Sequence, residues 1–266
     1  MIMLTARDSR RDMAQMRAAG ASAYLVKPFS QDKCIALVER TLAERRLIAY
    51  KEASALFISE GARAAAEERA RRGEALAFRA DERTVSIMFS DLVGFTPMSS
   101  ALSPPDLIAL LNDYFDVMCP IVKQHGGDID KFIGDAIMAV FDEVRGKPPA
   151  AERAVRAGLA MQAAMPAFNQ GRPVQLAMRI GINTGPVVRG DLGSRVVRRD
   201  YTVIGDTVNQ ANRYESRCPP GAVLISASTR VMLGERAQVR EVPGLALKGI
   251  AAPVTGYIVE SLAEDA

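Results

Sequence analysis

The fold of this 266-residue chain is decided by residues 84–97, TVSIMFSDLVGFTP. Val85, Ile87 and Phe89 alternate with less apolar neighbours, and this period of two predicts a half-buried strand. The strand ends at Asp91, so we expect this carboxylate at the strand's end and not in the core. A strand that ends in Asp before a glycine turn is common in proteins without any site there.

The second half of the same stretch indicates a ligand. Gly94 permits a sharp turn, and Thr96 followed by Pro97 predicts a helix N-cap and a first helical residue. Free N–H groups at a helix start attract phosphate, and a nearby carboxylate can hold a divalent cation. An acid, a glycine turn and a helix start within a few residues therefore suggest a nucleotide site.

Residues 126–141, GGDIDKFIGDAIMAVF, predict a β-hairpin, because two apolar runs flank the turn residues Gly134 and Asp135. If the hairpin pairs in an antiparallel sense with the first strand, Asp91 and Asp135 meet. Two carboxylates at one place repel each other unless cations lie between them. This arrangement is typical of a two-metal phosphoryl-transfer site.

A third stretch, residues 199–213 with the sequence RDYTVIGDTVNQANR, predicts a strand, a Gly-Asp turn and a helix. Asn209 and Arg213 are four residues apart and share one helical face. An amide and a guanidinium directed at one ligand suit a ribose oxygen and a phosphate. Without context such a pair is more often only solvated.

Composition limits the classes of function. Apolar residues make up 48% and charged residues 24%, as in a globular protein with a real core, and the net charge of +3 is too small for a nucleic-acid surface. The three cysteines lie far apart and match neither a zinc site nor a disulfide framework, which favours a reducing, cytoplasmic setting. No signal peptide and no membrane-length apolar run is present. His125 is the single histidine, which excludes His-based metal sites and Ser-His-Asp catalysis.

The chain divides into three predicted parts. Residues 1–45 alternate strand, helix, strand and helix in the α/β manner. Residues 46–81 form a helical linker of one or two exposed helices, either solvated or paired in a dimer coiled coil. Residues 82–262 form one α+β domain. Its order of strand, helix, hairpin, helix and strand predicts a ferredoxin-like, split β-α-β core.

Several element boundaries can be predicted inside residues 82–262. A helix opens at Ser103 and ends before Gly126, and Pro120 should kink or shorten it. An Ala-rich helix covers about 149–169, followed by strands near 175–183 and 198–204. A helix over 206–218 and three shorter strands near 223–226, 239–242 and 254–260 complete the domain.

From about residue 83 to 260 the chain resembles the class III nucleotidyl cyclase catalytic domain, on the motifs FSDLVGFT, DKFIGDAIMAVF, DYTVIGDTVNQANR and LKGIAAPV. The resemblance implies an adenylate cyclase that converts ATP to cyclic AMP in signal transduction, with two Mg²⁺ or Mn²⁺ ions per site. It also implies a head-to-tail homodimer, with the metal acids from one protomer and the base-binding, ribose and transition-state residues from the other. The implied roles are metal binding for Asp91 and Asp135, triphosphate contact through the backbone from Ile87 to Thr96, with Phe95 and Thr96 as substrate-binding residues, adenine reading for Lys131 and Thr202, phosphate contact for Arg179 and Lys248, ribose orientation for Asn209, and transition-state stabilisation for Arg213. Guanylate cyclases carry Glu and Cys where this chain has Lys131 and Thr202.

Residues 1–45 resemble the last part of a response-regulator receiver domain, which has a flavodoxin-like α/β fold. The resemblance implies that Thr5, Tyr24 and Lys27 are the switch Thr, the switch aromatic and the phosphate-contacting Lys, and that the peptide before Pro28 is cis. The earlier strands with the phospho-acceptor Asp are absent, so we expect no phosphorylation here. We therefore expect a truncated gene model or a fragment, and a histidine kinase partner only if the receiver is complete in the full-length protein.

Three alternatives accompany this interpretation. The domain could bind nucleotide without turning it over, although every expected position carries the matching residue type. It could use GTP. A polymerase-palm relative shares the core fold and the two carboxylates, but the chain lacks the basic surface and template-binding domains that such a protein needs.

Overall fold

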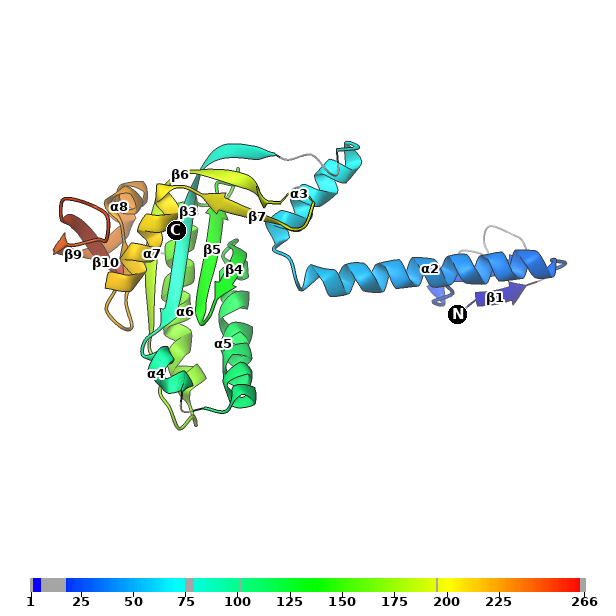
Figure 1. Cartoon of the computed structure of the whole chain (residues 1–266), viewed down its shortest axis with the longest axis horizontal. Helices are drawn as coiled ribbons and strands as arrows, with labels where there is room; N and C mark the ends of the chain where they lie inside the picture. The colour runs from blue at the N-terminus through cyan, green and yellow to red at the C-terminus, as the bar shows by residue number, and fades with distance from the viewer. Residues whose placement is uncertain (1, 6–17, 75–78, 101, 195, 264–266) are drawn as a thin grey trace. The chain divides into compact units, whose positions relative to one another are not determined.

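The computed structural model describes residues 2–5, 18–74, 79–100, 102–194 and 196–263. By internal contacts the chain forms two compact units, Met1–Ile58 and Ser59–Ala266 (Figure 1). The domain limits predicted at residues 45 and 81 remain predictions.

The described residues of the first unit form a two-stranded parallel sheet and one long helix. Strand β1 (Ile2–Thr5) pairs with β2 (Ala23–Val26), and helix α2 (Gln31–Ala55) follows. Ser30 caps α2, because its side chain accepts a hydrogen bond from the N–H of Lys33. The Lys27–Pro28 peptide is cis, as the receiver resemblance implied. The charged helix predicted before Gly20 falls largely on residues 6–17, outside the described residues.

The second unit begins with α3 (Glu60–Arg71) and is built on an eight-stranded mixed sheet. The strand order is β4-β5-β3-β6-β8-β10-β9, and β7 pairs with the far end of β6. The strands are β3 (Ala80–Leu92), β4 (Asp128–Ile133), β5 (Ala136–Asp142), β6 (Met178–Gly193), β7 (Arg199–Ile204), β8 (Val223–Ile225), β9 (Ala237–Leu245) and β10 (Val254–Leu262).

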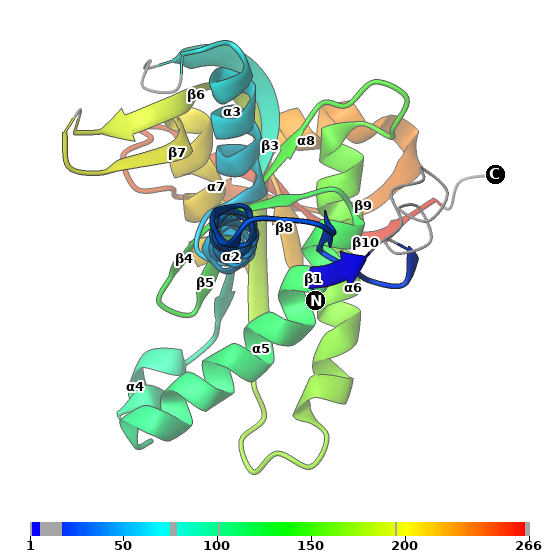
Figure 2. The same cartoon turned by 90° about the vertical axis from the view of Figure 1, so that its right-hand side faces the viewer.

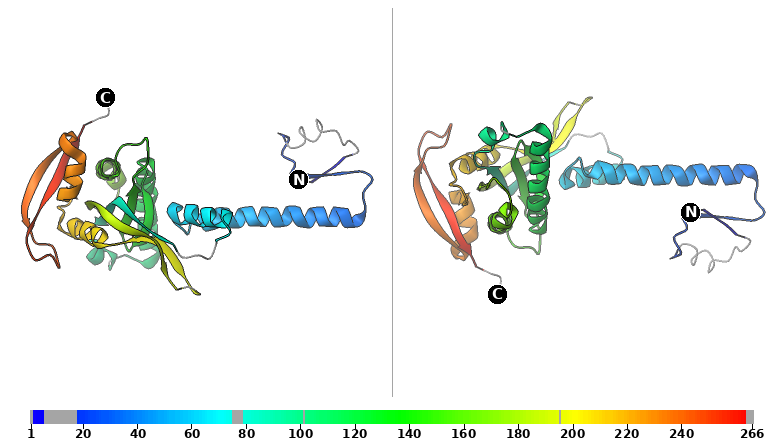
Figure 3. Two further views of the ribbon diagram at one scale, coloured as in Figure 1. Left: turned by 90° about the horizontal axis from the view of Figure 1, so that it is seen from above. Right: turned by 90° about the horizontal axis from the view of Figure 1, so that it is seen from below.

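Five further α-helices accompany the described strands: α4 (Phe95–Ser99), α5 (Pro104–Gln124), α6 (Ala150–Asn169), α7 (Asp206–Arg217) and α8 (Ala227–Leu233), the last followed by a short 3-10 turn, Gly234–Arg236. Along the chain β3, α5, β4, β5, α6 and β6 follow the order of the split β-α-β core. Helices α5 and α6 lie side by side (Figure 2), and α8 contacts β10 at the end of the sheet formed by β9 and β10 (Figure 3).

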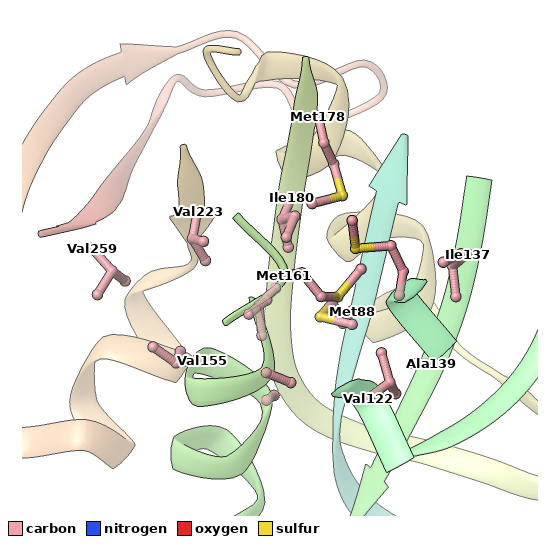
Figure 4. Packing of buried hydrophobic residues seen from close by; sticks show 14 of the residues in the cluster. Met88, Val122, Ile137, Ala139, Val155, Met161, Met178, Ile180, Val223 and Val259 are labelled. Carbon is pink, nitrogen blue, oxygen red and sulfur yellow. The ribbon is translucent and has the colours of Figure 1, made fainter. Parts of the chain in front are cut away.

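The main core lies between the sheet and helices α5 and α6. Met88 of β3, Met161 of α6 and Ile180 of β6 are fully buried there (Figure 4). A second cluster, which includes Ile87 and Ala211, packs α7 against the other face of β3. Because helices cover both faces, β3 is a rigid central support for whatever follows its last residues.

The two-sided burial of β3 corrects the prediction of a half-buried strand. Ser86, Met88 and Ser90 are as buried as the apolar residues between them. The prediction was wrong because two of these three residues are small and polar and therefore look solvent-facing in the sequence. The Ser86 and Thr184 hydroxyls are 2.7 Å apart, so this polar pair is satisfied inside the protein.

Other boundaries differ from the predictions in ways that have local causes. Helix α4 begins at Phe95, with Gly94 at φ +73° as its N-cap, so Thr96 is inside the helix and not its cap. Helix α5 continues past Pro120 to Gln124 and is not shortened. Strand β6 extends to Gly193, beyond the predicted end near residue 183, because its second half pairs with both β3 and β7. Helix α8 was not predicted.

Among the described residues, no helix combines the length and the apolar composition that crossing a membrane requires.

Candidate active site

Two carboxylates meet where β3 ends. In the antiparallel pairing of β3 with β5, Ser90 lies opposite Ile137, so the β4–β5 turn reaches the end of β3. Gly134 adopts φ +65° in this turn and places Asp135 at its tip. The backbone N–H of Leu92 donates a 3.1 Å hydrogen bond to Oδ2 of Asp135. The structure therefore brings Asp91 and Asp135 together, as the hairpin argument predicted.

The electrostatics of this pair call for a cation. Burial, together with the negative charge of Asp91, raises the pKa of Asp135 to about 6. Within the described residues no group of three or more candidate metal ligands is found. Two hard carboxylates that leave the remaining positions to substrate phosphates are the donor set by which Mg²⁺ is commonly held. The residues present thus fit a divalent cation that binds with a nucleotide.

Arg179 partly neutralises the site from the neighbouring strand. It lies directly opposite Asp91 in the β3–β6 register, and its Nη2 donates a 2.7 Å hydrogen bond to Oδ2 of Asp91. Its Nε also lies 2.5 Å from a carboxylate oxygen of Glu215, in an ion-pair contact rather than an aligned hydrogen bond. The resemblance implied that Arg179 contacts a phosphate of the substrate, and that role remains a prediction. Sequence reasoning missed Glu215, whose pKa burial raises, against the opposing charge of Arg179.

A second cluster joins the two residues expected to read the base. Oγ1 of Thr202 donates a 2.7 Å hydrogen bond to Oδ2 of Asp130, and Nζ of Lys131 lies 3.3 Å from the same oxygen. Burial raises the pKa of Asp130, while the Thr202 hydrogen bond and the Lys131 ammonium oppose the rise. The register of β4 against β5 shifts between Ile129 and Lys131, so Asp130 lies at a bulge. Sequence reasoning passed over Asp130, although it adjoins Lys131.

The ribose and transition-state candidates lie on α7. Asn209 is exposed and Arg213 is half-buried. A Cβ atom on Gly249 would lie 3.2 Å from Nη2 of Arg213, so the chain beside Lys248 passes close to this guanidinium. Among the described residues neither Arg213 nor Lys248 forms an ion pair. Two cations without an ion-pair partner, one on α7 and one on the segment that passes beside it, suit a polyanionic ligand. Gln210, for which the sequence suggested no role, donates a 2.5 Å hydrogen bond to Asp206 one turn earlier.

Helix α4 offers backbone N–H groups, rather than side chains, to a ligand. Phe95 packs against the main core and is therefore an anchor, which leaves its N–H and not its ring for a ligand. Thr96 lies in the first turn of α4. Contact of this segment with a triphosphate remains a prediction.

Helix α3 is anchored to the strands that carry the base-reading residues. The N–H groups of Glu60 and Gly61 donate to the Asp128 carboxylate, at 3.1 Å and 3.0 Å. This carboxylate at the start of β4 also accepts a 2.8 Å hydrogen bond from the buried guanidinium of Arg189 on β6. A carboxylate at a helix N-terminus compensates the helix dipole. Asp128 thus ties α3 to β4 and β6.

The other end of α3 is held in the same way. Arg69 forms a buried ion pair with Asp191 of β6, at 2.9 Å, and its guanidinium lies 5.9 Å from the ring centre of Tyr201 on β7. Sequence reasoning expected an exposed helix here, because the Ala, Arg and Glu composition has no broad apolar face. The attachment is ionic and therefore invisible to a search for apolar periodicity.

Similarity to known proteins is found in the part of the chain that contains this site. Residues 79–261 match the family described as "Adenylate and Guanylate cyclase catalytic domain". Over 144 residues the chain is 41% identical to an adenylate cyclase of Anabaena cylindrica. The aligned stretch covers 51% of this chain and 28% of that protein. The chain thus spans well under half the length of this curated relative.

Two solved structures are similar to the chain in fold and sequence. The adenylyl cyclase CyaB from P. aeruginosa is 36% identical, with a TM-score of 0.66, and the match covers 71% of this chain and 99% of that one. The guanylyl cyclase Cya2 is 38% identical, with a TM-score of 0.65, over 70% of this chain and 95% of that one. Enzymes named for either nucleotide are thus about equally similar.

Proposed function

Because the chain belongs to the adenylate and guanylate cyclase catalytic domain family, we propose that it converts ATP to 3′,5′-cyclic AMP and pyrophosphate, in signal transduction. The observation that carries the proposal is the meeting of Asp91 and Asp135 at the end of β3. A paired carboxylate site on a rigid central strand suits a triphosphate with its divalent cations.

We assign the reaction to a homodimer, in which each site takes Asp91 and Asp135 from one protomer and Lys131, Thr202, Asn209 and Arg213 from the other. Two divalent ions, Mg²⁺ or Mn²⁺, would lower the pKa of the ribose 3′-hydroxyl and polarise the α-phosphate when bound. Asp91 and Asp135 would hold these ions, and with them the triphosphate, at the end of β3. The 3′-hydroxyl gives its proton to solvent, its oxygen forms a bond to the α-phosphorus, and the bond from that phosphorus to the β-phosphate oxygen breaks as pyrophosphate leaves.

The other candidate site residues bind and orient the nucleotide and neutralise its negative charge. Asn209 orients the ribose, and the uncompensated guanidinium of Arg213 stabilises charge that grows on the transferred phosphate. Lys248 adds a second cation beside it. We keep phosphate contact as a proposal for Arg179, which would exchange Glu215 for the nucleotide as the site fills. The backbone of α4 at Phe95 and Thr96 supplies N–H donors to the same triphosphate.

The choice of ATP over GTP rests on the residue types at positions 131 and 202. Lys131 can donate to an acceptor on the base edge, and Thr202 can accept from an amino group, which together fit adenine. A guanylate cyclase is the second candidate, because the similar solved structures include enzymes named for each nucleotide.

For residues 1–45 we propose the final part of a receiver domain, supported by the parallel pairing of β1 with β2 and by the Lys27–Pro28 segment.

The direct test of the proposed activity is product analysis. Purified chain is incubated with ATP or GTP and with Mg²⁺ or Mn²⁺, at increasing protein concentration. We expect cyclic AMP, with a specific activity that rises with concentration as dimers form. Equal turnover of GTP would contradict the base assignment. Nucleotide binding with no product would instead support a silent binding module.

A further inference from the structure

The two residues proposed to read the base share a buried carboxylate that has no role in the mechanism above. Asp130 carries a side chain that is only 2% exposed, and its Oδ2 receives both the Thr202 hydroxyl and the Lys131 ammonium. An ionised carboxylate can only accept hydrogen bonds, so the hydrogen of the 2.7 Å contact belongs to Thr202. The direction of this bond is therefore fixed by chemistry.

Fixing that proton changes what Thr202 offers to a base. A free threonine hydroxyl has one donor and two acceptor lone pairs, and it rotates to suit either kind of partner. When its single proton points to Asp130, only the acceptor lone pairs remain. Thr202 is 3% exposed, so water does not compete for the proton. Thr202 becomes an obligate acceptor.

The edges of adenine and guanine differ in this respect. Adenine presents the acceptor N1 beside the donor amino group N6, whereas guanine presents the donor N1–H beside the acceptor O6. The Lys131 ammonium is a donor in all its orientations, and its side chain is 40% exposed, so it can turn toward a base edge. A donor at position 131 beside a fixed acceptor at position 202 matches adenine at both atoms and opposes guanine at both.

We propose that Asp130 is a specificity-positioning residue, which selects adenine by holding the Thr202 hydroxyl as an acceptor and the Lys131 ammonium beside it. The bulge at Asp130 allows this arrangement of the three side chains. Adjacent residues of a regular strand point to opposite faces, but the register shift between Ile129 and Lys131 lets the side chains of Asp130 and Lys131 meet. The inference rests on the proposed function, since it concerns the same base site.

The test compares kcat/KM for ATP with kcat/KM for GTP in one protein preparation. In Asp130→Ala the Thr202 hydroxyl is free to donate to guanine O6, so we expect the ATP-to-GTP ratio to fall about tenfold. Asp130→Asn keeps a carbonyl oxygen that can accept the Thr202 proton, so its ratio should fall less. The ratio is insensitive to a loss of folded protein, because both substrates meet the same enzyme.

Two further variants show whether Asp130 acts through Thr202. Thr202→Val keeps the shape and removes the hydroxyl, so adding Asp130→Ala to it should change the ratio much less than it does alone. Asp128→Asn is the matched structural control, since it replaces a partly buried carboxylate two residues earlier on the same strand. It should lower activity with both nucleotides and leave the ratio unchanged.

Binding supplies a readout that does not need turnover. The nucleotides 3′-deoxy-ATP and 3′-deoxy-GTP lack the attacking hydroxyl, and the ratio of their Kd values should shift in Asp130→Ala and Asp130→Asn as the kinetic ratio does. A wild-type chain that prefers guanine in both assays would overturn the proposed function and this inference together. A wild-type preference for adenine that Asp130→Ala and Asp130→Asn leave unchanged would overturn the inference alone.

Discussion

Arg179 on β6 and Asp91 on β3 lie directly opposite each other, and Nη2 of Arg179 donates a 2.7 Å hydrogen bond to the Asp91 carboxylate. The same guanidinium contacts Glu215, whose side chain is 6% exposed. One guanidinium therefore contacts two carboxylates, and the end of the site that holds Asp91 is linked to α7.

Removing this cation should destabilise the fold. In Arg179→Ala the buried Glu215 carboxylate loses the cation that compensates its charge, so we expect the free energy of unfolding to fall by about 2 kcal/mol. Denaturant titration measures the loss. Adding Glu215→Gln to the same variant should recover part of it. Arg198→Ala, whose pair with Asp200 is exposed, is the control and should change stability by less than about 0.5 kcal/mol.

The Asp91–Asp135 pair predicts a pH dependence of the metal-free chain. The pKa of Asp135 is about 6 in the folded chain against an ordinary value of 3.8, so between these values the folded state binds a proton that the unfolded state has lost. Stability therefore falls as the pH rises through this window. Asp135 is partly exposed, and after allowance for solvent screening the loss is about 1 kcal/mol.

Unfolding measurements across this pH window, with a chelator present, give the check. Asp135→Asn cannot ionise and should remove the decline, which makes the metal-free variant more stable than wild type near neutral pH. It should also abolish cyclase activity. A wild-type profile that rises with pH in the same window, and that Asp135→Asn leaves unchanged, would show that the two carboxylates do not repel each other.

The anchoring of α3 predicts that a Gly-to-Ala substitution in α3 destabilises the fold. A Gly-to-Ala substitution in α6, where the new methyl group has room, should have the opposite effect. In Gly61→Ala the new methyl group would overlap Nη2 of Arg189 and Oδ2 of Asp128, so both side-chain ends would have to shift and the ion pair between them would be disturbed. In Gly158→Ala on α6 the nearest atoms, on Val223, are at 3.4 Å, an ordinary contact. We expect Gly61→Ala to lose about 2 kcal/mol and Gly158→Ala to gain up to about 1 kcal/mol from helix propensity.

Thermal or denaturant unfolding of these two variants distinguishes a docked α3 from a loose one. If α3 were free of the sheet, Gly61→Ala would be neutral or slightly stabilising, as in any exposed helix. Loss of stability in Gly61→Ala alone would support the contact between α3 and Asp128.

The sequence predicted those parts of the fold in which a local pattern matched the final environment. The hairpin over residues 128–142 and the helices α5, α6 and α7 have strong periodicity or turn residues, and each was found within a few residues of its predicted limits. The meeting of Asp91 with Asp135 followed from one hairpin and one pairing direction. The far half of β6 could not be predicted, because its length depends on two partner strands.

The site residues that sequence reasoning missed share a different cause. Asp130 and Glu215 act through partners 72 and 36 residues away, Thr202 and Arg179, so no local spacing reveals them. Asp128, for which the sequence suggested no role, caps a helix 67 residues earlier in the chain. The position of the Asp130 side chain also depends on a bulge. The bulge interrupts the alternation of side chains between the two faces of the strand, from which a sequence pattern predicts the face of each residue.

The most direct test of the shared site is a mixing experiment that measures cyclic AMP formed from ATP. Asp91→Ala and Arg213→Ala should each be inactive alone, since each homodimer then lacks one half of both sites. When equal amounts are mixed, half of the dimers contain one intact site out of two, so roughly a quarter of the wild-type activity should return. Mixing each variant with itself is the control. Absence of any recovery, with heterodimers shown to form, would contradict the shared active site.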